Sequence, residues 1–100
     1  MATPINAIAK VRFSSAKPQR VHLVQGEGAE AELLCLESQQ EMPIARMSCL
    51  LYVITGTATL IEPVGRTTLQ AGQLLAPESD CTLANIGEQR LVCLAFRCGQ

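Results

Sequence analysis

Turn signals interrupt this chain about every six to ten residues, a spacing that fits short strands and leaves little room for helices. Gly, Pro, Asn and Gln separate runs that are rich in Val, Ile, Leu and Thr. No window carries apolar residues at the 3.6-residue period of an amphipathic helix. The pattern predicts an all-β sandwich or barrel of about nine to eleven short antiparallel strands. We expect these strands at residues 10–13, 20–24, 31–36, 41–47, 49–55, 57–61, 66–70, 73–76, 81–84 and 90–96.

Three of these runs also predict how the strands are placed. Residues 31–36 are almost wholly apolar, so both faces of that strand should be covered. Pro43 interrupts the run 41–47 and has no N–H to donate, which favours a position at the edge of a sheet or at the entry to a strand over a central one. Residues 57–61 alternate in polarity and should pair back onto 49–55 as a hairpin.

Length and composition predict a single domain spanning residues 1–100. Hydrophobic residues make up 48% of the chain and aromatic residues only 3%, with no Trp. The core must therefore be built from aliphatic side chains. A net charge of −1, no basic run and few aromatic residues argue against nucleic-acid binding and against an anionic membrane surface.

The first residues and the hydropathy pattern predict where the protein resides. No apolar stretch reaches the roughly 18 residues of a membrane span. Residues 1–13 lack the charged start and the continuous apolar run of a signal peptide. We therefore expect a cytoplasmic protein. In that compartment all five cysteines should stay free thiols, and Cys35 and Cys93, which lie in apolar runs, should serve as small hydrophobic residues. In a strand, Cys93 and Cys98 should point to opposite faces.

Two segments are informative by their order and separation. The first is LLYVITG at 50–56, preceded by a strand that contains a proline. The second is LQAGQLLAP at 69–77, in which Gly72 can turn the chain and Pro77 can end ladder pairing.

Across residues 20–96 these segments resemble the small single-domain cupins. The resemblance implies a double-stranded β-helix, or jelly-roll barrel. It also implies a metal held by two His and a Glu in the first segment and a His in the second. In this chain Cys49 stands at the Glu position, and Cys81 stands at the second-segment His, four residues before Asn85. The His pair falls on Pro43 and Ala45, or on Met42 and Ile44. All four expected ligands are thus replaced, and the usual metal chemistry does not carry over.

The replaced positions predict a metal-free pocket inside the barrel. Our candidate ligand-binding residues are Pro43, Ala45, Arg46, Cys49, Tyr52 and Cys81. Tyr52, Arg46 or His22 would supply polar contacts, depending on which face each strand presents. The expected role is binding of a small molecule without a metal cofactor.

An alternative uses the sulfur atoms of the same positions. Cys49 and Cys81, with Met42 or Met47, could hold a soft ion such as Cu(I), or the two cysteines could form a redox pair. The protein would then be an enzyme of dioxygenase, redox or isomerase type. No catalytic residue can be assigned from the sequence.

Three further features complete the site predictions. His22 is the only histidine and lies in a run that alternates polar and apolar, so a surface position is expected. The acidic segment from 27 to 37 should be a solvated face. Asp80, beside Cys81, is the carboxylate that we expect at the barrel mouth.

Cupins commonly dimerise, so the resemblance also implies a homodimer. Residues 1–18 form a lead-in to the barrel. Within it, residues 10–13 could add as an edge strand to a second copy.

Overall fold

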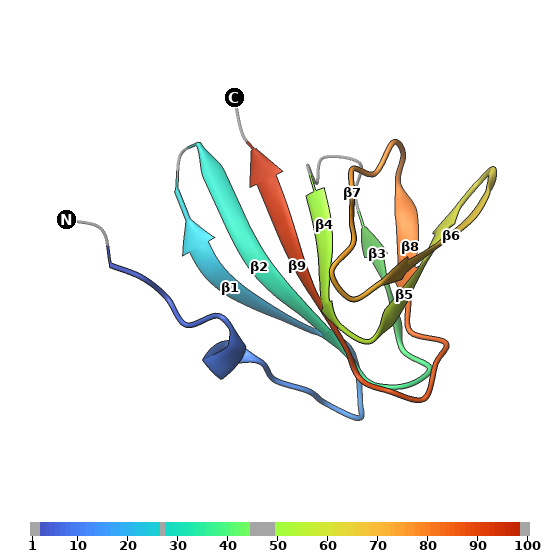
Figure 1. Cartoon of the computed structure of the whole chain (residues 1–100), viewed down its shortest axis with the longest axis horizontal. Coiled ribbons are helices and arrows are strands. Elements are labelled where there is room, and N and C mark those ends of the chain that lie inside the picture. The colour runs from blue at the N-terminus through green and yellow to red at the C-terminus, as the bar shows by residue number, and fades with distance from the viewer. Residues whose placement is uncertain (1–2, 27, 45–49, 99–100) are drawn as a thin grey trace.

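The computed structural model describes residues 3–26, 28–44 and 50–98. It contains two antiparallel sheets that diverge from a common lower end, as Figure 1 shows. The first sheet has the strand order β1-β2-β9-β4-β7, and the second has the order β3-β8-β5-β6. Within the described residues, the nine strands are β1 (Gln19–Gln25), β2 (Ala29–Leu36), β3 (Glu41–Ile44), β4 (Leu50–Thr55), β5 (Thr57–Glu62), β6 (Gly65–Gln70), β7 (Leu74–Leu75), β8 (Cys81–Ala84) and β9 (Leu91–Cys98). The predicted fold class and the predicted number of strands are therefore confirmed.

The main core lies between the two sheets. Strand alternation sends every second side chain of β2, β4 and β9 inward, where these side chains meet the inner faces of β3, β5 and β8. The members of this core are Leu34, Leu36, Met42, Ile44, Leu51, Val53, Ala58, Leu60, Leu69, Cys81, Leu83, Leu91, Cys93 and Ala95. All of them are aliphatic or sulfur-containing, in keeping with the low aromatic content of the chain.

A second apolar cluster covers the outer face of the first sheet. Leu33, Cys35 and Val92 are buried there under the N-terminal segment, whose Val11 and Phe13 pack against them. Since Leu34 and Leu36 face the main core, β2 is covered on both faces, as predicted.

The N-terminal segment does not form the strand expected at 10–13. Instead it contains a short 3₁₀ helix, η1 (Ile8–Lys10), and then runs beside β1 without joining the sheet (Figure 1). The ring of Phe13 lies 4.6 Å from the guanidinium carbon of Arg90, which holds this segment against its own barrel. Val11 and Phe13 therefore pack against the outer face of the first sheet, and residues 10–13 pair with no strand among the described residues.

The predicted hairpin between 49–55 and 57–61 is also wrong. β4 pairs with β9 and β7 in the first sheet, whereas β5 pairs with β6 and β8 in the second. Gly56 lies between them with a φ of 89°, and it carries the chain from one sheet to the other. A Cβ at this position would collide with the carbonyl oxygen of Arg90, so a glycine is required for close approach as well as for conformation.

The position predicted for Pro43 is confirmed. β3 is an edge strand of the second sheet and pairs only with β8 among the described residues. No helix in the described ranges is long and apolar enough to cross a membrane.

Candidate ligand-binding groove

The centre of the barrel is filled by side chains. In β3, Met42 and Ile44 point inward and are 6% and 3% exposed, whereas Pro43 is exposed on the other face. Of the two alignments considered from sequence, the structure therefore places Met42 and Ile44 inside. Leu34, Leu60 and Leu83 are fully buried in the same core. An open interior pocket is not formed by these residues.

A groove instead follows the seam where the edge strand of one sheet approaches the edge strand of the other. It lies between β1 and β3, and we call it the β1–β3 groove. Its upper part has a volume of about 370 Å³ and is lined by Arg20, Pro43, Ile44, Asp80 and Cys81. A lower part of about 410 Å³ continues past Lys17, Pro18, Gln19, Arg20, Glu41, Met42 and Pro43. The groove borders the core without entering it.

Arg20 is the residue that joins the two sheets across this groove. Its Nη1 donates to Glu32 Oε1 at 2.7 Å, and its Nη2 donates to the carbonyl oxygen of Pro43 at 2.9 Å. The Glu32 side chain is only 11% exposed, so the ion pair offsets much of the cost of burying that carboxylate. His22 Nδ1 lies 3.6 Å from the other oxygen of Glu32, and its ring is 64% exposed, as expected for a surface histidine.

The expectation for the acidic segment is therefore wrong at Glu32, which is buried against Arg20. Glu37 lies in an exposed ion pair, in which it accepts a 2.8 Å hydrogen bond from Nε of Arg90. Sequence reasoning missed the pairing of Arg20 with Glu32. The alternation of Arg20 and His22 along one strand face was visible, but Glu32 joins that face only through the register of β1 with β2, which matches His22 with Glu32.

Cys81 is the one predicted cysteine ligand that the described residues place at the groove, where the predicted sulfur donor Met42 also lies. It is 8% exposed, and burial, together with the nearby carboxylates of Glu62 and Asp80, raises the pKa of its thiol. A raised pKa disfavours the thiolate, which is the form that binds metals and attacks disulfides.

The inward residues that the structure describes do not form the metal site that the cupin resemblance implies. Where the resemblance expects the pair of His ligands, β3 places the side chains of Met42 and Ile44 in the interior. Within residues 3–26, 28–44 and 50–98, no group of three or more His, Cys, Asp or Glu side chains could hold a metal ion. The donor set that the described part of the barrel presents therefore does not fit a metal with oxygen and nitrogen ligands.

The remaining site predictions divide into three outcomes. Pro43 and Cys81 lie together along the groove, with Asp80 beside them. Tyr52 lies on the opposite face of β4 from Leu51 and Val53, and it is paired with Leu94 of the outer cluster, so it does not face the core. Ala45, Arg46, Met47 and Cys49 lie outside the described residues.

The other cysteines behave as predicted where the structure describes them. Cys35 and Cys93 are fully buried free thiols on opposite faces of neighbouring strands. Burial raises the pKa of Cys93 to about 12, so it remains a thiol at neutral pH. The side chain of Cys98 lies outside the described side chains.

No protein-family model matches the sequence, and comparison with curated proteins finds no match. Solved structures do match. A conserved protein with a double-stranded β-helix domain from Klebsiella pneumoniae aligns with a TM-score of 0.83 at 17% identity, covering 98% of this chain and 90% of that one. An RmlC-like cupin family protein from Methanocaldococcus jannaschii aligns with a TM-score of 0.72 at 19% identity, covering 89% and 86%. A cupin domain from Bordetella pertussis aligns with a TM-score of 0.70 at 14% identity, covering 84% and 95%.

At these identities the likeness establishes the fold and leaves the activity open. The sheet order, the inward-facing core and the structural neighbours agree with one another. The chain therefore has the double-stranded β-helix fold of the cupins.

Proposed function

We propose that this protein binds a small molecule in the β1–β3 groove without a metal cofactor. One observation carries the proposal: the barrel interior is packed with apolar side chains, while the groove beside it places a fixed guanidinium near apolar surface and a carboxylate. Binding sites of this kind combine a mostly apolar wall with a few oriented polar groups.

The lining suggests the chemical class of the ligand. Arg20 is held on two sides by Glu32 and the Pro43 carbonyl, so it presents a cation of defined position. Ile44 and Pro43 supply apolar contact beside it. A small organic acid with a short apolar body fits these features, because a carboxylate pairs with a guanidinium and the body covers the aliphatic wall.

A screen with two matched double variants tests the proposal. Reduced, EDTA-treated protein is screened by thermal shift against small organic acids and amino acids, and hits are confirmed by calorimetry. In Arg20→Gln/Glu32→Gln the pair can still hydrogen bond but carries no charge, and the hits should bind at least about tenfold more weakly. The control Arg90→Gln/Glu37→Gln removes an ion pair whose residues do not line the groove, and binding should not change.

The outcomes separate clearly. If the hits bind both double variants equally well, the groove is not the binding site. If no compound binds the reduced, metal-free protein but binding appears after a metal is added, the metal-independent part of the proposal is wrong.

The alternative of a sulfur-based enzyme rests on Cys81 with Cys49, the second of which lies outside the described residues. The raised pKa of Cys81 argues against a reactive thiolate. Elemental analysis of untagged, reduced protein checks this alternative directly. A near-equimolar metal that is lost in Cys81→Ser would favour the enzyme over the binding protein.

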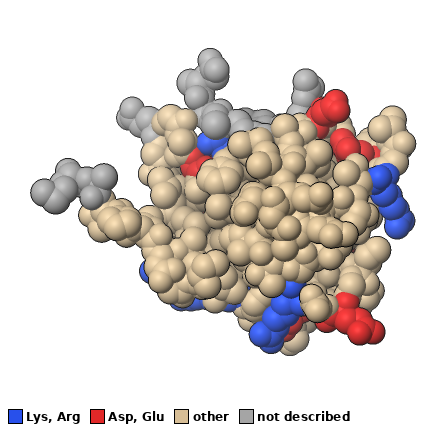
Figure 2. Space-filling model, viewed as in Figure 1, with Lys and Arg blue, Asp and Glu red and all other residues tan. Residues whose placement is uncertain are grey.

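We also propose a homodimer in the cytoplasm. The central part of the face in Figure 2 carries neither blue nor red side chains, which supports burial against a second copy. The buried free thiols of Cys35, Cys81 and Cys93 are in keeping with a reducing compartment.

A further inference from the structure

The free edge of β1 carries a feature that the small-molecule groove does not explain. β1 is the terminal strand of the five-stranded sheet, and among the described residues it pairs only with β2. A cleft of about 470 Å³ opens beside it, between the strand and the N-terminal segment. An edge strand exposes backbone N–H and C=O groups that can pair with an added strand.

The side chains that line this cleft include four basic groups, two of which, Arg20 and His22, also contact the buried carboxylate of Glu32. Lys10 and Arg12 come from the N-terminal segment, and Arg20 and His22 come from β1 itself. Neither Lys10 nor Arg12 forms an ion pair with a carboxylate of the described residues, whose ion pairs involve Arg20, His22, Arg90 and Arg97. The remaining lining residues are Ile5, Gln19, Val21 and Leu23.

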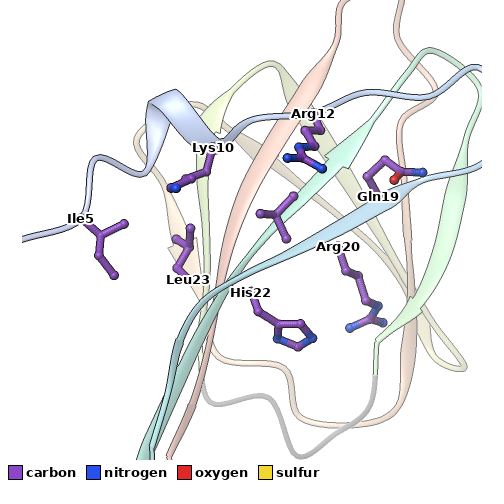
Figure 3. A pocket seen from close by; sticks show the side chains of 8 residues that line it. Ile5, Lys10, Arg12, Gln19, Arg20, His22 and Leu23 are labelled. Atoms are coloured by element: carbon purple, nitrogen blue, oxygen red, sulfur yellow. The ribbon is translucent and has the colours of Figure 1, made fainter.

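The basic groups lie on both sides of the strand. Figure 3 shows Lys10 and Arg12 projecting from the N-terminal segment on one side of β1, with Arg20 and His22 projecting on the other. Strand alternation agrees, because Val21 and Leu23 pack on the outer cluster with the N-terminal segment, while Arg20 reaches across to β3. A single small anion cannot contact both sides at once. An extended peptide can, because its own side chains alternate between the two faces.

We propose that the β1 edge binds an acidic peptide segment of a partner protein as an added strand. Backbone pairing with β1 supplies affinity, and acidic side chains on the two faces of the peptide meet Lys10 and Arg12 on one side and Arg20 and His22 on the other. A second copy of this chain is disfavoured at this edge. Pairing β1 with β1 would set the same basic groups against each other.

A fluorescein-labelled, end-capped peptide TEEVEET is the probe, and TKKVKKT is its matched control. Fluorescence anisotropy should show saturable binding of the acidic peptide only, weakening as salt is raised. Lys10→Glu and Arg12→Glu should each weaken binding by about threefold to tenfold. Arg66→Glu, an exposed charge reversal on β6, should leave binding unchanged and so controls for net charge. None of these positions lines the β1–β3 groove, so this test is independent of the small-molecule proposal.

Backbone pairing is tested with two further peptides that carry N-methyl groups on the amides of one peptide edge or of the other. Only one edge of an added strand pairs with β1, so one methylated peptide should lose binding and the other should retain it. Equal binding of both would overturn the proposal, since it would indicate a purely electrostatic surface. A homodimer that dissociates when the acidic peptide is added, as seen by light scattering, would place the second copy at this edge instead.

Discussion

Replacing Gly56 by Ala tests the crossing from the first sheet to the second, and Gly72 offers a matched control. Both glycines have a positive φ, 89° at Gly56 and 90° at Gly72. They differ in their surroundings, because a Cβ at Gly72 meets nothing within 4 Å, whereas one at Gly56 would collide with the Arg90 carbonyl and lie 3.1 Å from the Cα of Leu91.

The magnitudes follow from that difference. A left-handed backbone conformation costs a non-glycine residue about 1–2 kcal/mol, which is the whole expected loss for Gly72→Ala. In Gly56→Ala the clash with backbone atoms at the start of β9 adds about 1–3 kcal/mol of overpacking. We therefore expect Gly56→Ala to reduce the free energy of unfolding by about 2–5 kcal/mol, roughly 2 kcal/mol more than the control at the middle of the range.

Urea denaturation measures this directly. At a slope of about 1.5 kcal/mol per molar, a difference of 2 kcal/mol separates the two midpoints by about 1.3 M. Equal midpoints for the two alanine variants would refute the reasoning, because the contact between the Gly56 turn and β9 would then make no contribution. A wild-type midpoint for Gly72→Ala would show that the conformational cost is overestimated.

Three other outcomes are expected. Arg20→Ala should lower the free energy of unfolding by about 2 kcal/mol, because it leaves the buried carboxylate of Glu32 without its partner. Arg90→Ala breaks a more exposed pair with Glu37 and should lower the free energy of unfolding by about 1 kcal/mol. Equal losses for the two variants in urea titrations would contradict this reasoning. Burial raises the pKa of Cys93 from its ordinary 9.0 to about 12, so the native state keeps a proton that the unfolded chain loses. Stability should therefore fall as the pH rises from about 9 towards 12, and Cys93→Ala should flatten that fall in urea midpoints measured along the pH range. Light scattering at tens of micromolar should give the mass of a homodimer, and a monomer mass would refute that proposal.

Local chemistry decided most of the strand positions. The runs at 31–36, 57–61 and 81–84 are rich in β-favouring residues and bounded by turn residues, and each lies in a strand of the structure. The edge position of β3 also followed from a local fact, namely that Pro43 has no N–H.

Local chemistry did not predict the position of a segment that could pack or pair with more than one part of the chain. Residues 10–13 have the polarity of a strand, but Val11 and Phe13 gain more by covering Leu33 and Cys35 than by pairing. Residues 57–61 follow 50–55 directly, yet the close approach of Gly56 to Arg90 turns β5 into the other sheet.

For the candidate site, the sequence indicated Pro43 and Cys81, and the structure brings these two to one groove. It could not indicate which face Tyr52 occupies, nor that Arg20 would pair with Glu32 twelve residues away. The amino-acid sequence by itself determined the β-rich pattern and the aliphatic core, and it raised the expectation that the cupin ligand residues are replaced, because these depend on residue type and short-range spacing. The tertiary structure alone decided the strand order, the filled interior and the groove between β1 and β3, because these depend on the register between strands distant in sequence, which no local pattern encodes.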